Sequence, residues 1–182
     1  QVAERIGAAN TLDFQTRSAS NTDAPGFLET LAPLNLDRSR PVLLLGAGGS
    51  ARAIAVALTD AGFTLRVWNR TPERGVQMMA EVKGRGECVG LPDPTGCQLI
   101  VNATASGLAG NVPPVPWMDA APDTTAYDLV YGPASAPFLD SARGHGLRTM
   151  DGLGMLVAQG ALAFEQWLCI PAPRDVMLKA VS

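Results

Sequence analysis

The chain has 182 residues, enough for one well-buried domain or for one domain and part of another, but not for two of full size. Hydrophobic residues make up 47% and charged residues 17%, a composition that excludes a disordered chain. The net charge of -3 does not favour binding to nucleic acid or to an anionic membrane, since both attract basic proteins. No apolar run reaches the roughly 20 residues that cross a bilayer, and no signal-peptide stretch opens the sequence. A cytoplasmic protein without nucleic-acid or membrane partners is expected.

The first residues, up to about position 35, do not show a regular alternation of strands and helices. An apolar stretch predicts a strand at 6–14, a loop at 21–23 and a helix at 25–31. This segment is therefore expected to belong to a different unit from the rest of the chain.

From residue 41 onward, short apolar runs alternate with segments of helical character. Strands are predicted at 41–45, 64–68, 98–102, 125–131 and 147–150, with a weaker one at 87–89. Helices are predicted at 49–60, from Thr71 as N-cap with Pro72 in the first turn, and at 134–143 and 152–167, while a Pro-rich loop without strand or helix covers 107–124. Strands joined by helices pair in parallel, so the fold class is α/β, a doubly wound, mostly parallel sheet of Rossmann type.

A glycine-rich turn connects the first of these strands to its helix. It fits the pattern G-x-G-x-x-G/A, in which the first glycine allows a tight turn, the second lets the backbone approach a pyrophosphate and the small third residue permits close packing. The helix start that follows offers free N–H groups to an anion. The turn therefore predicts dinucleotide binding, with helix packing alone as the alternative, by the residues Gly46, Ala47, Gly48, Gly49, Ser50 and Ala51.

The end of the second predicted strand indicates which dinucleotide is bound. An NAD site usually has a carboxylate there, but this strand runs into Asn69-Arg70-Thr71. Arg70 can hold a 2′-phosphate with two hydrogen bonds, Asn69 and Thr71 add neutral ones, and Arg74 lies one turn further on. The pattern favours NADP, with a solvated arginine as the alternative.

The cysteines and the histidine exclude several kinds of chemistry. Cys88, Cys97 and Cys169 are widely spaced and form no C-x-x-C pair, so neither a disulfide framework nor a metal site is predicted. His145, the sole histidine, lies between two glycines and is predicted to be a turn residue. A Ser-His-Asp triad or a histidine proton donor is not expected.

Together with further motifs, these segments give the chain a close resemblance to the shikimate dehydrogenase family, NADP-dependent enzymes that interconvert 3-dehydroshikimate and shikimate in aromatic amino-acid and chorismate biosynthesis. The motifs that carry the resemblance, besides the glycine-rich turn and Asn69-Arg70-Thr71, are Ile6-Gly7-Ala8-Ala9-Asn10-Thr11, Asn21-Thr22-Asp23-Ala24-Pro25-Gly26-Phe27, Val101-Asn102-Ala103-Thr104, Asp128-Leu129-Val130-Tyr131 and Asp151-Gly152-Leu153-Gly154-Met155-Leu156-Val157-Ala158-Gln159-Gly160.

The resemblance implies roles for individual residues. Asp23 resembles the carboxylate half of the family's catalytic Lys-Asp pair and, like Asn10, a ligand of substrate hydroxyls, with Tyr131 and Gln159 as further substrate contacts. The nicotinamide side would be lined by Ala103, Thr104, Ala105, Leu129, Gly152 and Met155.

Each substrate role has a structural alternative. Asn10 can cap a turn, Asn21 and Asp23 can form an Asx-turn before a helix, and Gln159 can be a solvated helix residue. Tyr131, on a predicted buried strand, can belong to the core.

One part of the family's machinery has no match. The catalytic lysine of the family lies upstream of the segment that holds Asn10, and neither Lys83 nor Lys179 falls in a matching motif. Since the chain also starts at Gln1, it is expected to be processed or part of a longer protein that contains most of the N-terminal substrate domain, and to be inactive alone.

The expected organisation has three parts. Residues 1–22 are a remnant of the α/β substrate domain, 23–151 form the NADP-binding domain, and 152–182 are helices that return to the substrate domain. The connections at 22–26 and 150–154 contain glycine and are expected to permit cleft closure. A quinate-oxidising relative and a non-catalytic NADP-binding module remain alternatives, and a homodimer is one option for assembly.

Overall fold

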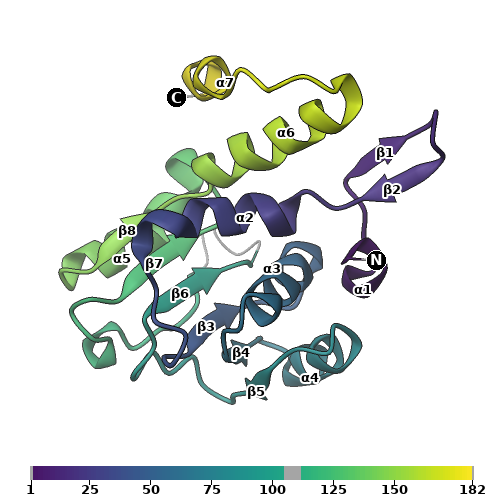
Figure 1. The fold of residues 1–182 in the computed structure, drawn as a ribbon. Coiled ribbons are helices and arrows are strands. Elements are labelled where there is room, and N and C mark those ends of the chain that lie inside the picture. The colour runs from purple at the N-terminus through teal and green to yellow at the C-terminus, as the bar shows by residue number, and fades with distance from the viewer. Residues whose placement is uncertain (1, 105–111, 182) are drawn as a thin grey trace.

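A computed structural model describes residues 2–104 and 112–181, and its centre is a parallel sheet of six strands (Figure 1). The order across the sheet is β5-β4-β3-β6-β7-β8. The strands are β3 (Val42–Leu45), β4 (Leu65–Trp68), β5 (Gly86–Cys88), β6 (Leu99–Asn102), β7 (Thr125–Asp128) and β8 (Arg148–Met150). The chain builds outward from β3 in one direction and then from β6 in the other, so the strand order reverses between these two strands. In such sheets ligands bind beyond the carboxyl ends of the strands at this reversal.

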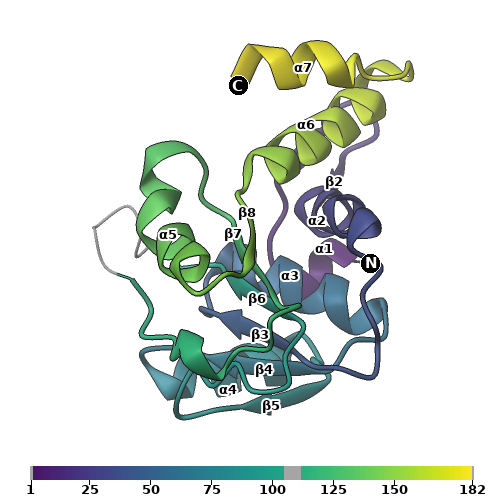
Figure 2. The same ribbon diagram turned by 90° about the vertical axis from the view of Figure 1, so that its left-hand side faces the viewer.

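Helices cover both faces of the sheet. Figures 1 and 2 show α2 and α3 on one face and α5 on the other. The α-helices are α1 (Val2–Ile6), α2 (Asp23–Leu31), α3 (Gly49–Asp60), α4 (Pro72–Glu81), α5 (Ala136–Gly144), α6 (Leu153–Leu168) and α7 (Arg174–Val181). Successive residues of β3 point to opposite faces, and Val42 and Leu44 join one buried cluster while Leu43 and Leu45 join the other. A strand buried on both faces has a continuous apolar sequence, as β3 does.

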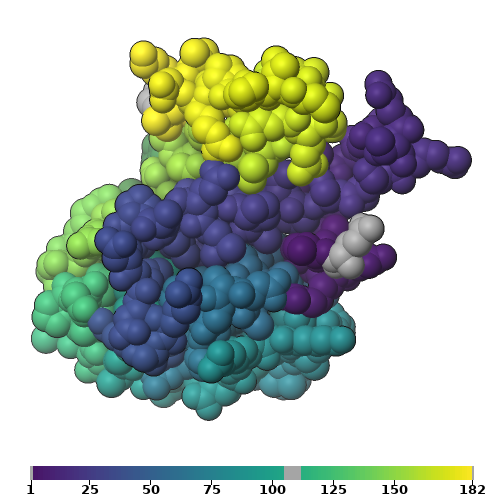
Figure 3. Space-filling view, in the orientation of Figure 1, coloured from purple at the N-terminus to yellow at the C-terminus, as the bar shows by residue number. Residues whose placement is uncertain are grey.

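The N-terminal segment forms a separate antiparallel hairpin of β1 (Thr11–Asp13) and β2 (Ser18–Ser20) that projects from the body of the molecule (Figure 3). Its base is fastened to the C-terminal half of α6. The Ser20 hydroxyl donates to Gln166 at 2.7 Å, and the Trp167 indole N–H donates to the Leu12 carbonyl oxygen at 2.9 Å. The first and last parts of the chain therefore meet.

The predicted doubly wound α/β fold is confirmed, and α3 has the predicted bounds. The predicted strand at 6–14 is wrong, because Val2–Ile6 is a helix and only Thr11–Asp13 is extended. Ile6 is buried against other helices rather than in a sheet, and a five-residue helix with one buried side chain has no readable periodicity.

Other elements differ at their ends. The strand predicted at 125–131 stops at Asp128, so Tyr131 is not on a strand. The described part of the Pro-rich loop contains a 3-10 helix at Trp117–Asp119, anchored by the buried Trp117. Helix α2 begins at Asp23, two residues before the predicted start, so most of the connection expected at 22–26 is helical.

Candidate active site

The turn after β3 has the geometry that its glycines predict. Gly46 has φ +112°, and a Cβ there would lie 2.9 Å from the Ala103 carbonyl oxygen, so only glycine fits against the loop that follows β6. A Cβ at Gly48 would meet nothing within 4 Å, so that backbone faces open space. Since no side chain caps α3, the amide groups of its first turn are available to a ligand. The turn fits a diphosphate group.

A cavity of about 590 Å³ opens beside this turn at the carboxyl edge of the sheet. It contains most of the residues predicted to bind the cofactor, and its described lining includes no carboxylate. That lining is Gly46, Ala47, Gly48, Trp68, Asn69, Arg70, Thr71, Arg74, Ala103, Thr104, Val112, Pro113 and Pro114. Trp68 and the three residues from 112 to 114 were not predicted from the sequence. They add apolar surface opposite the polar turn.

The end of the cavity beyond β4 is positively charged. The Asn69 side-chain amide donates to the Thr71 carbonyl oxygen at 2.7 Å and thereby shapes the turn that carries Arg70. Arg70 and Arg74 are both exposed, and among the described residues neither guanidinium forms an ion pair. Two guanidinium groups that form no ion pair, in a cavity whose described lining has no carboxylate, suit a phosphate group. Thr71 occupies the N-cap position of α4 as predicted, but its side chain makes no capping bond.

A second, smaller cavity of about 270 Å³ brings together the residues predicted to contact substrate. They come from the segment before β1, the start of α2, the turn after β7, and α6. The described lining is Asn10, Asp23, Ser50, Leu129, Tyr131, Gly152, Met155, Leu156 and Gln159. Four residues assigned from sequence to the cofactor, Ser50, Leu129, Gly152 and Met155, lie here beside the substrate group. The Ser50 position, in the first turn of α3, joins this cavity to the glycine-rich turn.

The side-chain amide of Asn10 is held by hydrogen bonds at both its nitrogen and its oxygen. Its Nδ2 donates to Asp23 Oδ1 at 2.9 Å, and its Oδ1 accepts from the Thr22 backbone N–H at 2.9 Å and from the Thr22 hydroxyl at 3.2 Å. These contacts fix which end of the amide faces the carboxylate. Thr22 is fully buried and was not among the predicted site residues. The one feature of the sequence that could have identified Thr22 is its position within the Asn21-Thr22-Asp23 motif.

Asp23 is a partly buried carboxylate at the first position of α2. Loss of water around the group raises its pKa, and the hydrogen bond from Asn10 offsets part of that rise. The Asx-turn predicted as an alternative is present at Asn21, whose Oδ1 accepts the backbone N–H groups of Asp23 and Ala24 at 3.0 and 3.3 Å. Asn21 thus sets the helix start, while the Asp23 side chain lines the cavity.

Gln159 and Tyr131 complete the polar lining. Gln159 is half-buried on α6, where its Nε2 donates to the Leu156 carbonyl oxygen at 2.9 Å and its Oε1 accepts from the Thr22 hydroxyl at 3.5 Å. It is therefore not a solvated helix residue. Tyr131 is 49% exposed and lies at the cavity rather than in the core.

Two of the remaining predicted residues fall outside the described lining of both cavities. Gly49 and Ala51 lie in the first turn of α3, where Ala51 is fully buried as the small third residue of the motif. Ala105 lies outside the described residues. Neither Lys83 nor Lys179 is among the residues that line the cavity around Asp23.

Two further sequence predictions concern histidine and metals. His145 follows α5 as predicted for a turn, with its Nδ1 2.8 Å from the Ser141 carbonyl oxygen. Within residues 2–104 and 112–181, no group of three His, Cys, Asp or Glu side chains is placed to hold a metal ion. In the same ranges, no helix is both long and apolar enough to span a membrane.

Known proteins resemble the chain along nearly its whole length. Residues 152–181 match the family model described as the shikimate 5'-dehydrogenase C-terminal domain. A shikimate dehydrogenase (NADP(+)) of Thermus thermophilus is 45% identical over 91% of this chain and 63% of its own length. That of Carboxydothermus hydrogenoformans is 39% identical over 99% of this chain and 69% of its own length. The chain belongs to the shikimate dehydrogenase family. It spans about two thirds of the length of these curated relatives.

The chain also resembles solved structures of known enzymes. The shikimate 5-dehydrogenase of Thermus thermophilus, in complex with NADP(H) and shikimate, superimposes with a TM-score of 0.85 at 42% identity, over 98% of this chain and 69% of that one. A 5-ketofructose reductase from Gluconobacter sp. strain CHM43 gives a TM-score of 0.88 at 34% identity, over 100% of this chain and 70% of that one.

Proposed function

We propose that this chain is the NADP(H)-binding part of an enzyme that reduces 3-dehydroshikimate to shikimate. The observation that carries the proposal is the cavity beside the glycine-rich turn, with Arg70 and Arg74 at one end and the Asn10–Asp23 pair beyond the other. Membership of a family whose named relatives use NADP supports it. Residues 23–151 are assigned to cofactor binding, with 1–22 and 152–182 on the substrate side.

In this proposal the backbone turn and the start of α3 bind the diphosphate, and Arg70 and Arg74 bind the 2′-phosphate. Bound NADPH would supply the hydride. Ala103 and Thr104 line the larger cavity, and Leu129, Gly152 and Met155 line the smaller one. These groups orient the reactants and exclude water.

The substrate's hydroxyls would be held by Asn10, Asp23, Tyr131 and Gln159. Asn10 donates a hydrogen bond to Asp23 Oδ1. Asp23 Oδ2 is therefore the atom that would exchange a proton or accept a hydrogen bond from a substrate hydroxyl. Burial raises the pKa of Asp23, which favours the protonated form more than in an exposed carboxyl group and suits a proton-exchanging role. A location in the cytoplasm is part of the proposal, and the three free cysteines, Cys88, Cys97 and Cys169, are typical of a reducing compartment.

Titration of the two oxidised cofactors tests the proposal, with tryptophan emission as the signal because Trp68 lines the cavity. Arg70→Ala removes a charge-assisted contact worth about 1.5–3 kcal/mol, so NADP+ should bind at least about tenfold more weakly while the Kd of NAD+ stays nearly unchanged. Arg148→Ala, which removes an exposed guanidinium on β8, is the matched control and should change neither Kd. Equal losses for both cofactors at Arg70 would reject the assignment.

A second candidate is reduction of a different polyhydroxylated ketone. The specific observation in its favour is the overlap with 5-ketofructose reductase, whose TM-score is 0.88. Binding of shikimate, quinate and fructose to the NADP+-saturated chain separates the candidates, since the correct polyol should bind most tightly. Preference for fructose would replace the shikimate assignment.

A further inference from the structure

A buried polar pair joins the ends of two neighbouring strands, β6 and β7, next to the cavities. Asn102 and Asp128 are the last residues of β6 and β7, are register partners across the sheet, and are both 0% exposed. Asn102 Nδ2 donates to Asp128 Oδ2 at 3.1 Å. Neither residue belongs to the described lining of either cavity.

Each member of the pair also holds the loop that follows its own strand. Asn102 Oδ1 accepts the backbone N–H and the hydroxyl of Thr104 at 3.1 and 2.7 Å, and Thr104 lines the larger cavity. Asp128 Oδ1 accepts the Val130 N–H at 3.0 Å, between Leu129 and Tyr131 of the smaller cavity. The two cavity walls are thus connected through two side chains.

The wall on the Asp128 side is closely packed. The Gly152 N–H donates to the Val130 carbonyl oxygen at 3.0 Å, and a Cβ at Gly152 would collide with the Leu129 carbonyl group. A displacement of the turn after β7 would therefore move the start of α6, which carries Met155. Small displacements are sufficient to reduce reaction rates, since about 1 Å of misplacement can cost about a hundredfold.

The strands do not need this pair in order to associate. β6 and β7 already pair along their whole length through backbone bonds. Burying a carboxyl group among neutral partners costs stability. Burial, with a smaller contribution from Asp151 in the β8–α6 connection, raises the pKa of Asp128 to about 6 against the lowering effect of the Val130 and Asn102 hydrogen bonds.

We propose that Asn102 and Asp128 form a positioning pair that sets the cofactor wall at Thr104 relative to the substrate wall at residues 129–131. The inference rests on the proposed function, because it assigns a purpose to the pair within that site. Asp128 acts on the cofactor only through Asn102 and Thr104.

The experiment compares NADP+ affinity in the whole chain and its variants. Asp128→Asn replaces two acceptor oxygens by one, so either Val130 or Asn102 loses its partner, and the Kd of NADP+ should rise at least about fivefold. Asn102→Ser, whose shorter side chain cannot reach both partners, should give a similar loss and serves if Asp128→Asn does not fold. The double variant should lose no more than the larger single loss, within about twofold, because both changes break one chain of contacts. Asp123→Asn, just before the amino end of β7, should stay within about twofold of the wild type.

A pH series gives a readout that a purely structural role would not change. Protonated Asp128 cannot accept on both oxygens, so the wild type should lose NADP+ affinity relative to Asp128→Asn as the pH falls through about 6. The comparison of the two proteins matters because the 2′-phosphate of the ligand titrates in the same range and affects both.

The possible failures are distinct. If the wild type binds no NADP+, the proposed function fails and the inference with it. If the wild type binds NADP+ and the folded Asp128→Asn and Asn102→Ser variants bind it equally well, only the inference is overturned. Additive losses in the double variant, or an equal loss in Asp123→Asn, would also overturn it.

Discussion

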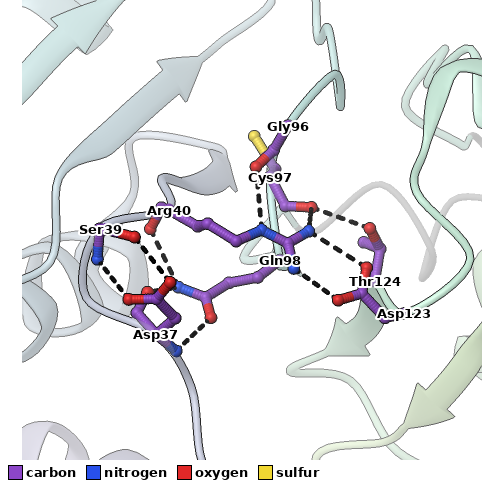
Figure 4. Close-up of polar contacts among 8 residues, drawn as sticks. All are labelled: Asp37, Ser39, Arg40, Gly96, Cys97, Gln98, Asp123 and Thr124. Carbon is purple, nitrogen blue, oxygen red and sulfur yellow. Dashed lines mark hydrogen bonds and ion pairs between the residues drawn. The ribbon is translucent and has the colours of Figure 1, made fainter.

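The amino ends of the strands lie at one edge of the six-stranded sheet and their carboxyl ends at the other. The side chains at these two edges differ in whether they have partners within the protein. At the amino edge, Arg40 binds the Asp123 carboxylate with both terminal nitrogens, at 2.5 and 3.2 Å, and also donates to the carbonyl oxygens of Gly96 and Cys97 (Figure 4). Gln98 bridges the backbone of Asp37 and Arg40 beside it. The charged and amide side chains drawn there all have partners within the protein.

The carboxyl edge has the opposite character. Its turn is made of glycine backbone, α3 starts without a side-chain cap, and Arg70 and Arg74 form no ion pair within the described residues. The buried carboxyl group of Asp128 has an amide and a backbone N–H as partners instead of a guanidinium. The amino edge closes the loops over the core, whereas the carboxyl edge leaves donors and charges for a ligand.

The largest expected difference between the edges is in the pH dependence of stability. The pKa of Asp128 is raised to about 6 by burial, so the folded state binds its proton more tightly than the unfolded state, whose pKa is about 3.9. Its stabilisation is complete below the unfolded value and is lost as the pH rises through about 6. The free energy of unfolding of the wild type, relative to Asp128→Asn, should therefore increase by about 2 kcal/mol between about pH 7 and about pH 4 in urea titrations.

Asp123 should show the opposite sign. Its hydrogen bonds from Arg40 lower its pKa, so its stabilisation is present above the unfolded pKa and is lost as the pH falls through the folded one. Relative to Asp123→Asn, the wild type should lose stability on acidification. If the free energy of unfolding changed with pH in the same direction at Asp123 and at Asp128, the proposed difference between the two edges would be wrong.

Replacement of Asp23 by Asn tests catalysis at the carboxyl edge. The variant keeps the shape and the contact with Asn10 but cannot exchange a proton, so kcat for NADP-linked shikimate oxidation should fall about a hundredfold or more, with the NADP+ Kd within about twofold. Absorbance of the reduced cofactor gives the rate. Because the family's catalytic lysine has no match in this chain, both rates are measured in a longer protein that contains it. A wild type of that length that binds NADP+ without turnover would instead favour a binding module.

Replacement of Arg40 by Ala tests the amino edge. Loss of the Asp123 pair and of two bonds to carbonyl oxygens should lower the free energy of unfolding by about 1–2 kcal/mol, a value reduced by the partial exposure of the pair. The Kd of NADP+ should not change. A clear loss of affinity in a fully folded Arg40→Ala variant would show that the two edges are coupled.

The smallest expected effect belongs to Tyr131. Tyr131→Phe removes one exposed hydroxyl from the smaller cavity and should weaken shikimate binding to the NADP+-saturated chain about three- to fivefold. Calorimetric titration measures this change. An unchanged Kd would show that the hydroxyl makes no substrate contact.

The sequence predicted best those features that depend on neighbouring residues. The turn at Gly46, the bounds of α3 and the arginines after β4 follow from short motifs whose backbone requirements are local. The lining by Trp68 and by residues 112–114 depends on how distant loops approach one another, which no local pattern encodes. Thr22 was missed because its importance lies in contacts with Asn10 and Gln159, the latter 137 residues away.

The same local reasoning failed at the N-terminus. Ile6 reads equally well as a strand or a helix residue, and it is buried in a cluster with residues of α3, which lies later in the chain and packs against α1. The family resemblance did not correct this error, because it assigned roles to residues and not secondary structure to the segment.

The attachment of the β1–β2 hairpin to α6 links parts of the chain 146 and 155 positions apart in sequence. The hairpin is thus held on the same helix that packs along α2. A spectroscopic label at the exposed Phe14 should therefore report changes in the position of α6, although the two lie near opposite ends of the polypeptide.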